Sequence, residues 1–191
     1  IASASPELFL KREGKRIRTS PIKGTAPVGT TDFGVKDRAE NVMIVDLMRN
    51  DFGRICKSGT VEVPRLLSSE EHPGLQHLVS DIQGELVDDI SWSQIITALS
   101  PPGSVSGAPK SSAVQVISGN EIDRGPYCGA LGWVEGNQAV LSVAIRTFWK
   151  DSGINFGTGA GITWGSDATA EWEETQLKAR RLISIAGGEL L

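Results

Sequence analysis

Acidic and basic residues from two distant parts of the chain have a spacing that could support chemistry. Glu171, Glu174 and Lys178 follow one another at i, i+3 and i+7, so a helix would present them on one face. Asp37 and Glu40 repeat the i, i+3 acidic spacing in an earlier segment. Carboxylates from two helices, with water and substrate oxygens, are ligands that Mg²⁺ accepts. The two pairs therefore predict a divalent-cation site, although the same spacing also suits solvent-facing residues and an ordinary i, i+4 ion pair.

Lys23, in the stretch Pro21-Ile22-Lys23-Gly24-Thr25, is a candidate nucleophile. A free lysine has a pKa of about 10.4, so holding such an amine neutral at pH 7 costs about 4.6 kcal/mol. Nucleophilic lysines overcome this cost through desolvation or nearby positive charge. Apolar Ile22 and small Gly24 would allow close packing and close approach of a substrate. The alternative is a surface lysine in a loop.

Two glycine-rich stretches have the composition of nucleotide-binding loops but lack the required spacing. In Gly157-Thr158-Gly159-Ala160-Gly161, the next residue is Ile162, where the dinucleotide fingerprint requires its last glycine. In the stretch 103–111, Pro109 stands where a P-loop has glycine, and proline offers no N–H to a phosphate. Both nucleotide interpretations are rejected. The stretches are then tight turns, or loops whose backbone N–H groups could hold a carboxylate.

Length and composition favour one globular domain over residues 1–191, with 39% hydrophobic and 22% charged residues. A net charge of −4 without a concentrated run of Lys and Arg argues against a nucleic-acid surface. No apolar run reaches the length of a membrane span, and we predict a cytoplasmic protein. Cys56 and Cys128 lack metal-ligand spacing and are predicted to be reduced thiols. Because Ile1 is not an initiator Met, we expect the chain to be part of a longer protein.

Hydrophobic periodicity and turn residues predict an α+β fold with a mainly antiparallel sheet and flanking helices. The expected elements are a hairpin over 7–19, a loop over 24–35, helices over 36–48, 92–99, 109–118 and 168–186, and strands over 60–67, 78–86, 127–134, 139–149 and 154–156. Ser91 is expected to cap the second helix, and a polar turn at 49–51 to end the first. His72 is expected in a loop, and His77, beside apolar Leu78, to be structural.

Short motifs along nearly the whole chain resemble those of the chorismate-utilising enzymes. This family includes anthranilate synthase component I, aminodeoxychorismate synthase component I, and isochorismate and salicylate synthases. In order the motifs are Ser5-Pro6-Glu7-Leu8-Phe9, Pro21-Ile22-Lys23-Gly24-Thr25, Ala39-Glu40-Asn41, Val45-Asp46-Leu47-Met48-Arg49-Asn50-Asp51, Gly53-Arg54, His77-Leu78-Val79, Gly107-Ala108-Pro109-Lys110, Ala144-Ile145-Arg146-Thr147, Gly159-Ala160-Gly161 and Glu171-Trp172-Glu173-Glu174-Thr175. The resemblance implies the C-terminal half of an anthranilate-synthase-like α/β sandwich.

The resemblance also implies a Mg²⁺ ion that bridges the enzyme and the ring carboxylate of chorismate. Glu40 and Glu174 would then be direct metal ligands, and Asp37 and Glu171 would act through water. Asp37 departs from the Glu expected in the salicylate branch, and its shorter side chain suits a water-mediated role. Glu7 would be the general acid that helps the C4 hydroxyl leave, a role that requires a raised pKa.

The substrate-binding residues implied by the resemblance form two groups. Arg146 and Tyr127 would hold the enolpyruvyl carboxylate, because the guanidinium fork pairs bidentately with a carboxylate. Gly159, Ala160 and Gly161 would add backbone donors. The residues that would line the rest of the site are Gly24, Thr25, His77, Ser104 and Lys178.

Within the family, Lys at the position of Lys23 resembles the aminodeoxychorismate synthases, whereas the other branches usually carry Ala. The resemblance implies attack of the Lys23 amine at C2 of chorismate, followed by ammonia addition at C4, in a pathway to 4-aminobenzoate and folate. Ammonia would come from a glutamine amidotransferase subunit or a fused domain. Anthranilate synthase component I and, from another class, a non-catalytic folded fragment are the alternatives. The stretch from Thr25 to Arg38 is about ten residues shorter than expected, either by deletion or because a loop segment is not part of this sequence.

Overall fold

Two antiparallel sheets organise the part of the chain that the computed structural model describes, residues 1–29, 33–72 and 75–189. The strands of the larger sheet are β2 (Leu8–Glu13), β3 (Arg16–Ser20), β4 (Ile22–Ala26), β5 (Glu62–His72), β6 (Leu75–Glu85), β7 (Ala130–Glu135) and β8 (Gln138–Val143). Their order is β4-β6-β3-β2-β8-β7, and β5 also pairs with β6. The smaller sheet has the order β1-β9-β10, with bounds Ala2–Ser3, Thr147–Lys150 and Ile154–Phe156. The prediction of an α+β fold with an antiparallel sheet is confirmed.

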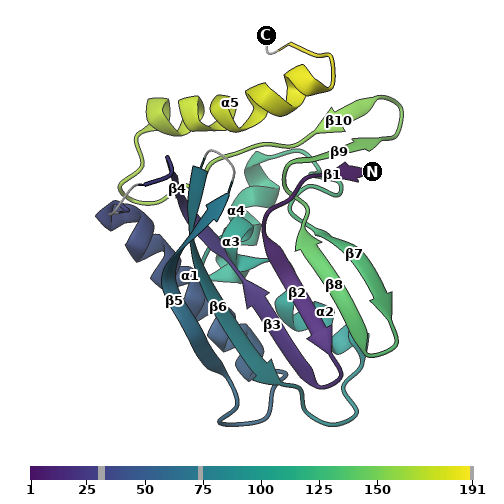
Figure 1. Ribbon diagram of the computed structural model, residues 1–191. Helices are drawn as coiled ribbons and strands as arrows, with labels where there is room; N and C mark the ends of the chain where they lie inside the picture. The colour runs from purple at the N-terminus through teal and green to yellow at the C-terminus, as the bar shows by residue number, and fades with distance from the viewer. Residues whose placement is uncertain (30–32, 73–74, 190–191) are drawn as a thin grey trace.

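Helices cover one face of the larger sheet and one of its ends (Figure 1). They are α1 (Val35–Gly53), α2 (Trp92–Leu99), α3 (Gly103–Ser106), α4 (Lys110–Asn120) and α5 (Ala168–Ile185). Figure 1 shows α1 running along the sheet, while α5, in yellow, crosses above the end where β4 and the start of α1 lie. The N-terminal end of α1 and the whole of α5 therefore lie near the same end of the sheet.

The hydrophobic core fills the space between the larger sheet and helices α1 and α2. Its fully buried side chains include Leu10, Ile17, Phe52, Ile82 and Leu99. A buried polar group also joins α1 to β6. Asn41 donates to the carbonyl oxygen of Leu78, at 3.1 Å, and accepts from the Ser80 hydroxyl at 2.6 Å. Because these groups satisfy one another, a polar residue on the inner face of α1 is compatible with burial.

The first helix extends beyond its predicted end. The polar residues 49–51 do not form a turn, and α1 continues to Gly53. Asp51 is buried and its carboxylate lies 2.6 Å from the Lys110 ammonium, while Phe52 is completely buried in the core. Tertiary burial and a buried ion pair therefore outweigh the turn preference of an Arg-Asn-Asp sequence.

Several other element boundaries differ from the predictions. The strand expected over 139–149 is divided into β8 and β9, because the backbone turns at Arg146, whose φ is 49°. The strand expected from residue 127 begins at Ala130, after a turn in which Cys128 has φ of 67°. Residues 24–26 of the loop expected over 24–35 belong to the sheet as the end of β4, and residues 30–32 of that loop lie outside the described residues. His72 ends β5 and is not in a loop.

The hairpin turning at 13–15 and the short strand at 154–156 are confirmed, and the helix over 92–99 has the predicted bounds. Ser91 caps this helix through a capping box with Gln94, as predicted. The last helix starts after Asp167, whose carboxylate accepts from the Ala170 N–H at 2.9 Å. The short helix α3 was not predicted. None of the helices in the described residues has both the length and the apolar composition that crossing a bilayer requires.

Candidate active site

Glu7 and Lys23 face the same buried region from two parts of the larger sheet. Glu7 lies just before β2 and is 5% exposed, and its main-chain carbonyl accepts from the Val143 N–H. Burial raises the pKa of the Glu7 carboxyl to about 7, while the Ser104 side chain and the Lys23 charge act in the opposite direction. A carboxyl with this pKa can hold a proton near neutral pH and give it up, which is what a general acid requires.

Lys23 reaches this region from β4. Its Nζ donates to the main-chain carbonyl oxygen of Ser104 at 3.0 Å. A Cβ on Gly161 would lie only 3.7 Å from the same Nζ, so the lysine also borders the glycine-rich loop. Lys23 is therefore partly buried among Ser104, Gly161 and Glu7, and it is not a surface lysine in an open loop.

Ser104 is positioned by α3, the short helix that the sequence did not predict. This helix packs against α1 so closely that a Cβ on Gly103 would overlap the Leu47 side chain. The Ser104 Oγ atom is buried and lies close enough to the Glu7 carboxyl to lower its pKa, although within the described residues no group is at full hydrogen-bond geometry to this oxygen. Buried hydroxyl groups normally have a partner, so the Ser104 hydroxyl is expected to bond either to Glu7 or to a ligand beside Glu7 and Lys23.

The glycine-rich loop after β10 lies against Tyr127. A Cβ on Gly157 would overlap the Tyr127 ring, and one on Gly159 would lie 3.1 Å from its phenolic oxygen. Because Gly157 and Gly159 have no side chains, the loop can lie directly against the Tyr127 ring. Burial raises the pKa of the Tyr127 hydroxyl, so this group remains a neutral hydrogen-bond donor.

Arg146 follows the kink between β8 and β9. Burial lowers the pKa of its guanidinium, which is half-buried, and no acidic side chain pairs with it within the described residues. The segment that carries Arg146 is bonded to the turn after Tyr127, because the Cys128 N–H donates to the Ala144 carbonyl at 3.0 Å. A half-buried cation without an acidic partner favours an anionic ligand, since an unpaired charge is costly to remove from water.

The acidic residues of α1 and α5 converge, and a lysine lies among them. Lys36 Nζ is 2.8 Å from Glu171 Oε1 and 3.9 Å from Glu40 Oε1. The charge of Glu174 also raises the pKa of Lys36, so three carboxylates act on this ammonium. Hydrogen bonds from Lys36 and Ser166 lower the pKa of Glu171. Sequence reasoning missed Lys36, although its i, i+4 relation to Glu40 is a recognisable signal.

Asp37 links the acidic cluster to the region of Lys23. A Cβ on Gly24, which has φ of 83°, would lie 3.0 Å from the Cβ of Asp37. On the other side, Lys178 pairs with Glu174 at 2.7 Å and donates to the Gly159 carbonyl at 3.2 Å. The predicted i, i+4 ion pair is thus present, and it also joins α5 to the glycine-rich loop.

The residues around Lys36 fit a hard cation. Glu40 Oε1 is buried and has no hydrogen-bond partner within the described residues, so it offers an unsatisfied anionic oxygen. No three side chains of His, Cys, Asp or Glu in the described residues are grouped closely enough to form a complete metal site by themselves. Mg²⁺ does not need such a cage, because it retains waters and takes substrate oxygens beside one or two carboxylates.

Thr25 and His77 form a cross-strand pair between β4 and β6. Thr25 Oγ1 lies 2.9 Å from His77 Nδ1, and His77 is 2% exposed. This burial agrees with a structural histidine, and its contact with Thr25 places it one residue from Gly24. The two cysteines are free and buried, as expected for reduced thiols.

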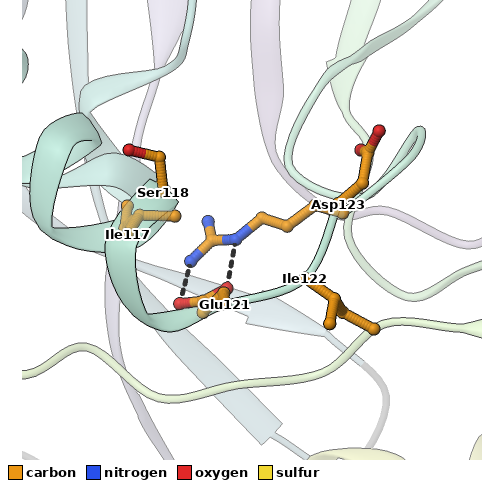
Figure 2. Close-up of a pocket in the computed structure, with 6 residues that line it drawn as sticks. Ile117, Ser118, Glu121, Ile122 and Asp123 are labelled. Atoms are coloured by element: carbon orange, nitrogen blue, oxygen red, sulfur yellow. Dashed lines mark hydrogen bonds and ion pairs between the residues drawn. The ribbon is translucent and has the colours of Figure 1, made fainter.

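A separate cavity of about 350 Å³ lies at the C-terminal end of α4 (Figure 2). It is lined by Ile117, Ser118, Glu121, Ile122, Asp123 and Arg124. Two of its charged groups satisfy each other, because the Arg124 guanidinium pairs bidentately with Glu121 at 2.6 and 2.7 Å, and Asp123 accepts from the Gly125 N–H. This cavity contains none of the candidate residues. The candidate active site is therefore identified by the chemistry of its side chains and not by the presence of a large cavity.

Comparison with known proteins identifies the family. The sequence profile described as chorismate binding enzyme matches residues 1–184, and the chain belongs to this family. The chain is 39% identical to anthranilate synthase component 1 of Aquifex aeolicus over 96% of its own length and 40% of that protein. It is also 39% identical to aminodeoxychorismate synthase component 1 of Escherichia coli, over 96% of its length and 44% of that protein.

The solved structures agree with this assignment. The crystal structure of anthranilate synthase component I from Streptococcus pneumoniae superposes with a TM-score of 0.80 and 32% identity. The match covers 94% of this chain and 42% of that chain. The chain therefore spans less than half the length of these relatives, and it has the fold of the corresponding part of a chorismate binding enzyme.

Proposed function

We propose that these residues are the catalytic C-terminal part of a Mg²⁺-dependent aminodeoxychorismate synthase, which converts chorismate to 4-amino-4-deoxychorismate for 4-aminobenzoate and folate synthesis. The observation that carries this proposal is that Lys23 and Glu7 both lie beside Ser104, with Lys23 donating to its carbonyl oxygen and Glu7 interacting with its side chain. A lysine whose charge acts on a nearby carboxyl of raised pKa gives a nucleophile and a general acid within one site.

The proposed reaction consists of two displacements. The Lys23 amine forms a bond to C2 of chorismate, and the C4 hydroxyl leaves as water with a proton from Glu7. Ammonia then forms a bond to C4, the bond between C2 and the lysine nitrogen breaks, and Glu7 recovers a proton from the entering nitrogen. The new nitrogen ends para to the ring carboxylate, whereas direct attack of ammonia at C2 would leave it ortho.

Several residues would hold the substrate and the cation. The unpaired Arg146 guanidinium, with the neutral Tyr127 hydroxyl and the backbone of Gly159–Gly161, would bind the enolpyruvyl carboxylate. Mg²⁺, held directly by Glu40 and Glu174 and through water by Asp37 and Glu171, would supply the positive charge that binds the ring carboxylate. Gly24, Thr25, His77, Ser104 and Lys178 would complete the lining.

Ammonia would be supplied by a glutamine amidotransferase, as a separate subunit or a fused domain. The word "component" in the names of the relatives supports a multi-part enzyme. Anthranilate synthase is the second candidate, because anthranilate synthase component 1 of Aquifex aeolicus and aminodeoxychorismate synthase component 1 of Escherichia coli are both 39% identical to this chain. Lys23 favours the aminodeoxychorismate branch, since a covalent lysine step explains a para product.

The test is the position of the new nitrogen. The intact protein is given chorismate, Mg²⁺ and ammonium, and the product is identified by chromatography and mass spectrometry. The proposal expects 4-amino-4-deoxychorismate, which retains the enolpyruvyl group. Anthranilate with release of pyruvate would preserve the family and overturn the branch. Failure of any chorismate to react would favour a folded part that only binds.

A further inference from the structure

Lys36 occupies the space among the carboxylates that we propose as metal ligands. It lies at the start of α1, and its ammonium bridges from α1 to α5 through Glu171, at 2.8 Å. Its distance to Glu40 Oε1 is 3.9 Å, too long for a hydrogen bond. The charges of Glu171, Glu40 and Glu174 all raise the pKa of Lys36, and the hydrogen bond to Glu171 is the largest cause. Lys36 and Lys178, which pairs with Glu174, thus supply two positive charges to three carboxylates.

An ammonium satisfies this cluster only in part. Glu171 Oε1 accepts from both Lys36 and Ser166, at 2.8 and 2.6 Å. Glu40 Oε1, in contrast, is buried and has no hydrogen-bond partner in the described part of the chain. The donors are therefore concentrated on one carboxylate, while another lacks any. A divalent cation carries twice the charge and binds several oxygens at once, so it would serve this arrangement better than an ammonium.

Within the described residues, Lys36 has no hydrogen bond or ion pair outside the acidic cluster. The side chain of Lys36 is 51% exposed, whereas that of Glu171 is 7% exposed. If Lys36 rotated into solvent, its ammonium would regain hydration, and Glu171 would keep the Ser166 hydroxyl as a donor. Lys178 differs, because it is held both by Glu174 and by the Gly159 carbonyl. Lys36 is therefore the cation of this cluster with the fewest other attachments.

We propose that Lys36 is an internal competitor for the divalent cation: it neutralises the carboxylates in the metal-free protein and moves into solvent when the metal enters. The inference rests on the proposed magnesium site and adds a residue that sets the affinity of that site. Lys36 keeps cation binding weak until the substrate carboxylate supplies further oxygens. In this role it is a positioning residue of the acidic cluster and does not touch the reacting atoms.

The experiment measures Mn²⁺ binding to the intact protein without chorismate, from the electron paramagnetic resonance signal of the free ion. Lys36→Met removes the ammonium and keeps an unbranched side chain. We expect Mn²⁺ to bind about fivefold more tightly, which corresponds to about 1 kcal/mol for a partly exposed ion pair. Lys36→Arg, which keeps the charge, is expected to bind Mn²⁺ at least as weakly as the natural protein.

Lys57 provides a matched control. It also lies near two carboxylates, Glu85 at 2.6 Å and Asp88 at 3.8 Å, but follows the opposite end of α1. Lys57→Met makes the same change in net charge and is expected to leave Mn²⁺ affinity unchanged. An equal gain in both Met variants would assign the effect to net charge and overturn the inference.

Two further outcomes separate the inference from the proposed function. If the natural protein binds Mn²⁺ in a manner that Glu174→Gln abolishes, and Lys36→Met does not tighten binding, the metal site stands and the competitor role falls. If neither the natural protein nor Lys36→Met binds Mn²⁺, the metal site itself is wrong and the inference falls with it. Binding by Lys36→Met with weak or absent binding by the natural protein supports the competitor role.

Discussion

Replacing Glu7 by Gln should stabilise the protein at high pH and not at low pH. Burial raises the pKa of this carboxyl from 4.5 to about 7 in the folded state. Each unit corresponds to 1.36 kcal/mol, so ionised Glu7 destabilises the fold by about 3 kcal/mol. Glutamine has a similar shape and remains neutral, so it removes this cost while the catalytic proton is lost.

The sign follows from proton binding. Below pH 4.5 the carboxyl is protonated in both the folded and unfolded states, and the two proteins should be equally stable. Between pH 4.5 and 7 the unfolded chain ionises first, so the natural protein loses stability as pH rises, by about 1.4 kcal/mol per unit. Above pH 7 the Glu7→Gln protein should keep the full advantage of about 3 kcal/mol in unfolding free energy over the natural protein. The stability contributed by the folded-state proton is thus present at low pH and lost as pH rises through 7.

The assay is urea unfolding of the intact protein, followed by tryptophan fluorescence from pH 4.5 to 8. Glu135→Gln, at the exposed end of β7, is the control and should change stability by less than about 0.5 kcal/mol throughout. A difference between Glu7→Gln and the natural protein that is constant with pH would refute a buried carboxyl of raised pKa. It would also remove the reason for assigning Glu7 as the general acid.

Three further substitutions test other parts of the site. Lys23→Ala should abolish 4-amino-4-deoxychorismate formation, measured by chromatography; normal formation would refute the covalent route. Arg146→Gln should weaken chorismate binding about 10-fold to 100-fold through loss of a charge-assisted carboxylate contact, measured by titration calorimetry; unchanged binding would exclude Arg146 as the carboxylate site. Lys110→Met leaves buried Asp51 unpaired and should cost about 3 kcal/mol of unfolding free energy, and adding Asp51→Leu should recover part of it. Additive losses in urea unfolding would contradict that coupling.

Local patterns in the sequence located most elements but not all of their ends. The Ser91 capping box and the hairpin turn at residues 13–15 are local signals, so the structure follows them. The end of α1 depends instead on Lys110, which is distant in sequence and pairs with Asp51. The division of the 139–149 segment depends on the left-handed backbone of Arg146. Propensity alone does not predict a left-handed arginine, because few non-glycine residues adopt positive φ.

The candidate site could be predicted in composition but not in arrangement. The motifs around Glu7, Lys23 and Glu171 were recognisable because each is a short run of residues. The neighbours that decide their chemistry are not local: Ser104 accepts from Lys23 across 81 positions, and Lys36 contacts Glu171 across 135. The spacing of the carboxylates predicts metal ligands, but it does not indicate that Lys36 balances their charge when no metal is bound, because that contact joins two distant helices.

The physical reason for this difference lies in how each part of the site is attached. Lys23 is placed by β4, whose pairing with β6 fixes its position by main-chain hydrogen bonds. The acidic residues of α5 have no comparable support, because only Glu171 and Ala179 of that helix are buried. Polar contacts hold α5 instead, from Lys36 to Glu171 and from Lys178 to the Gly159 carbonyl. The groups that would bind the cation are therefore the same groups that attach the helix, so the position of α5 depends on the charge balance within the candidate site.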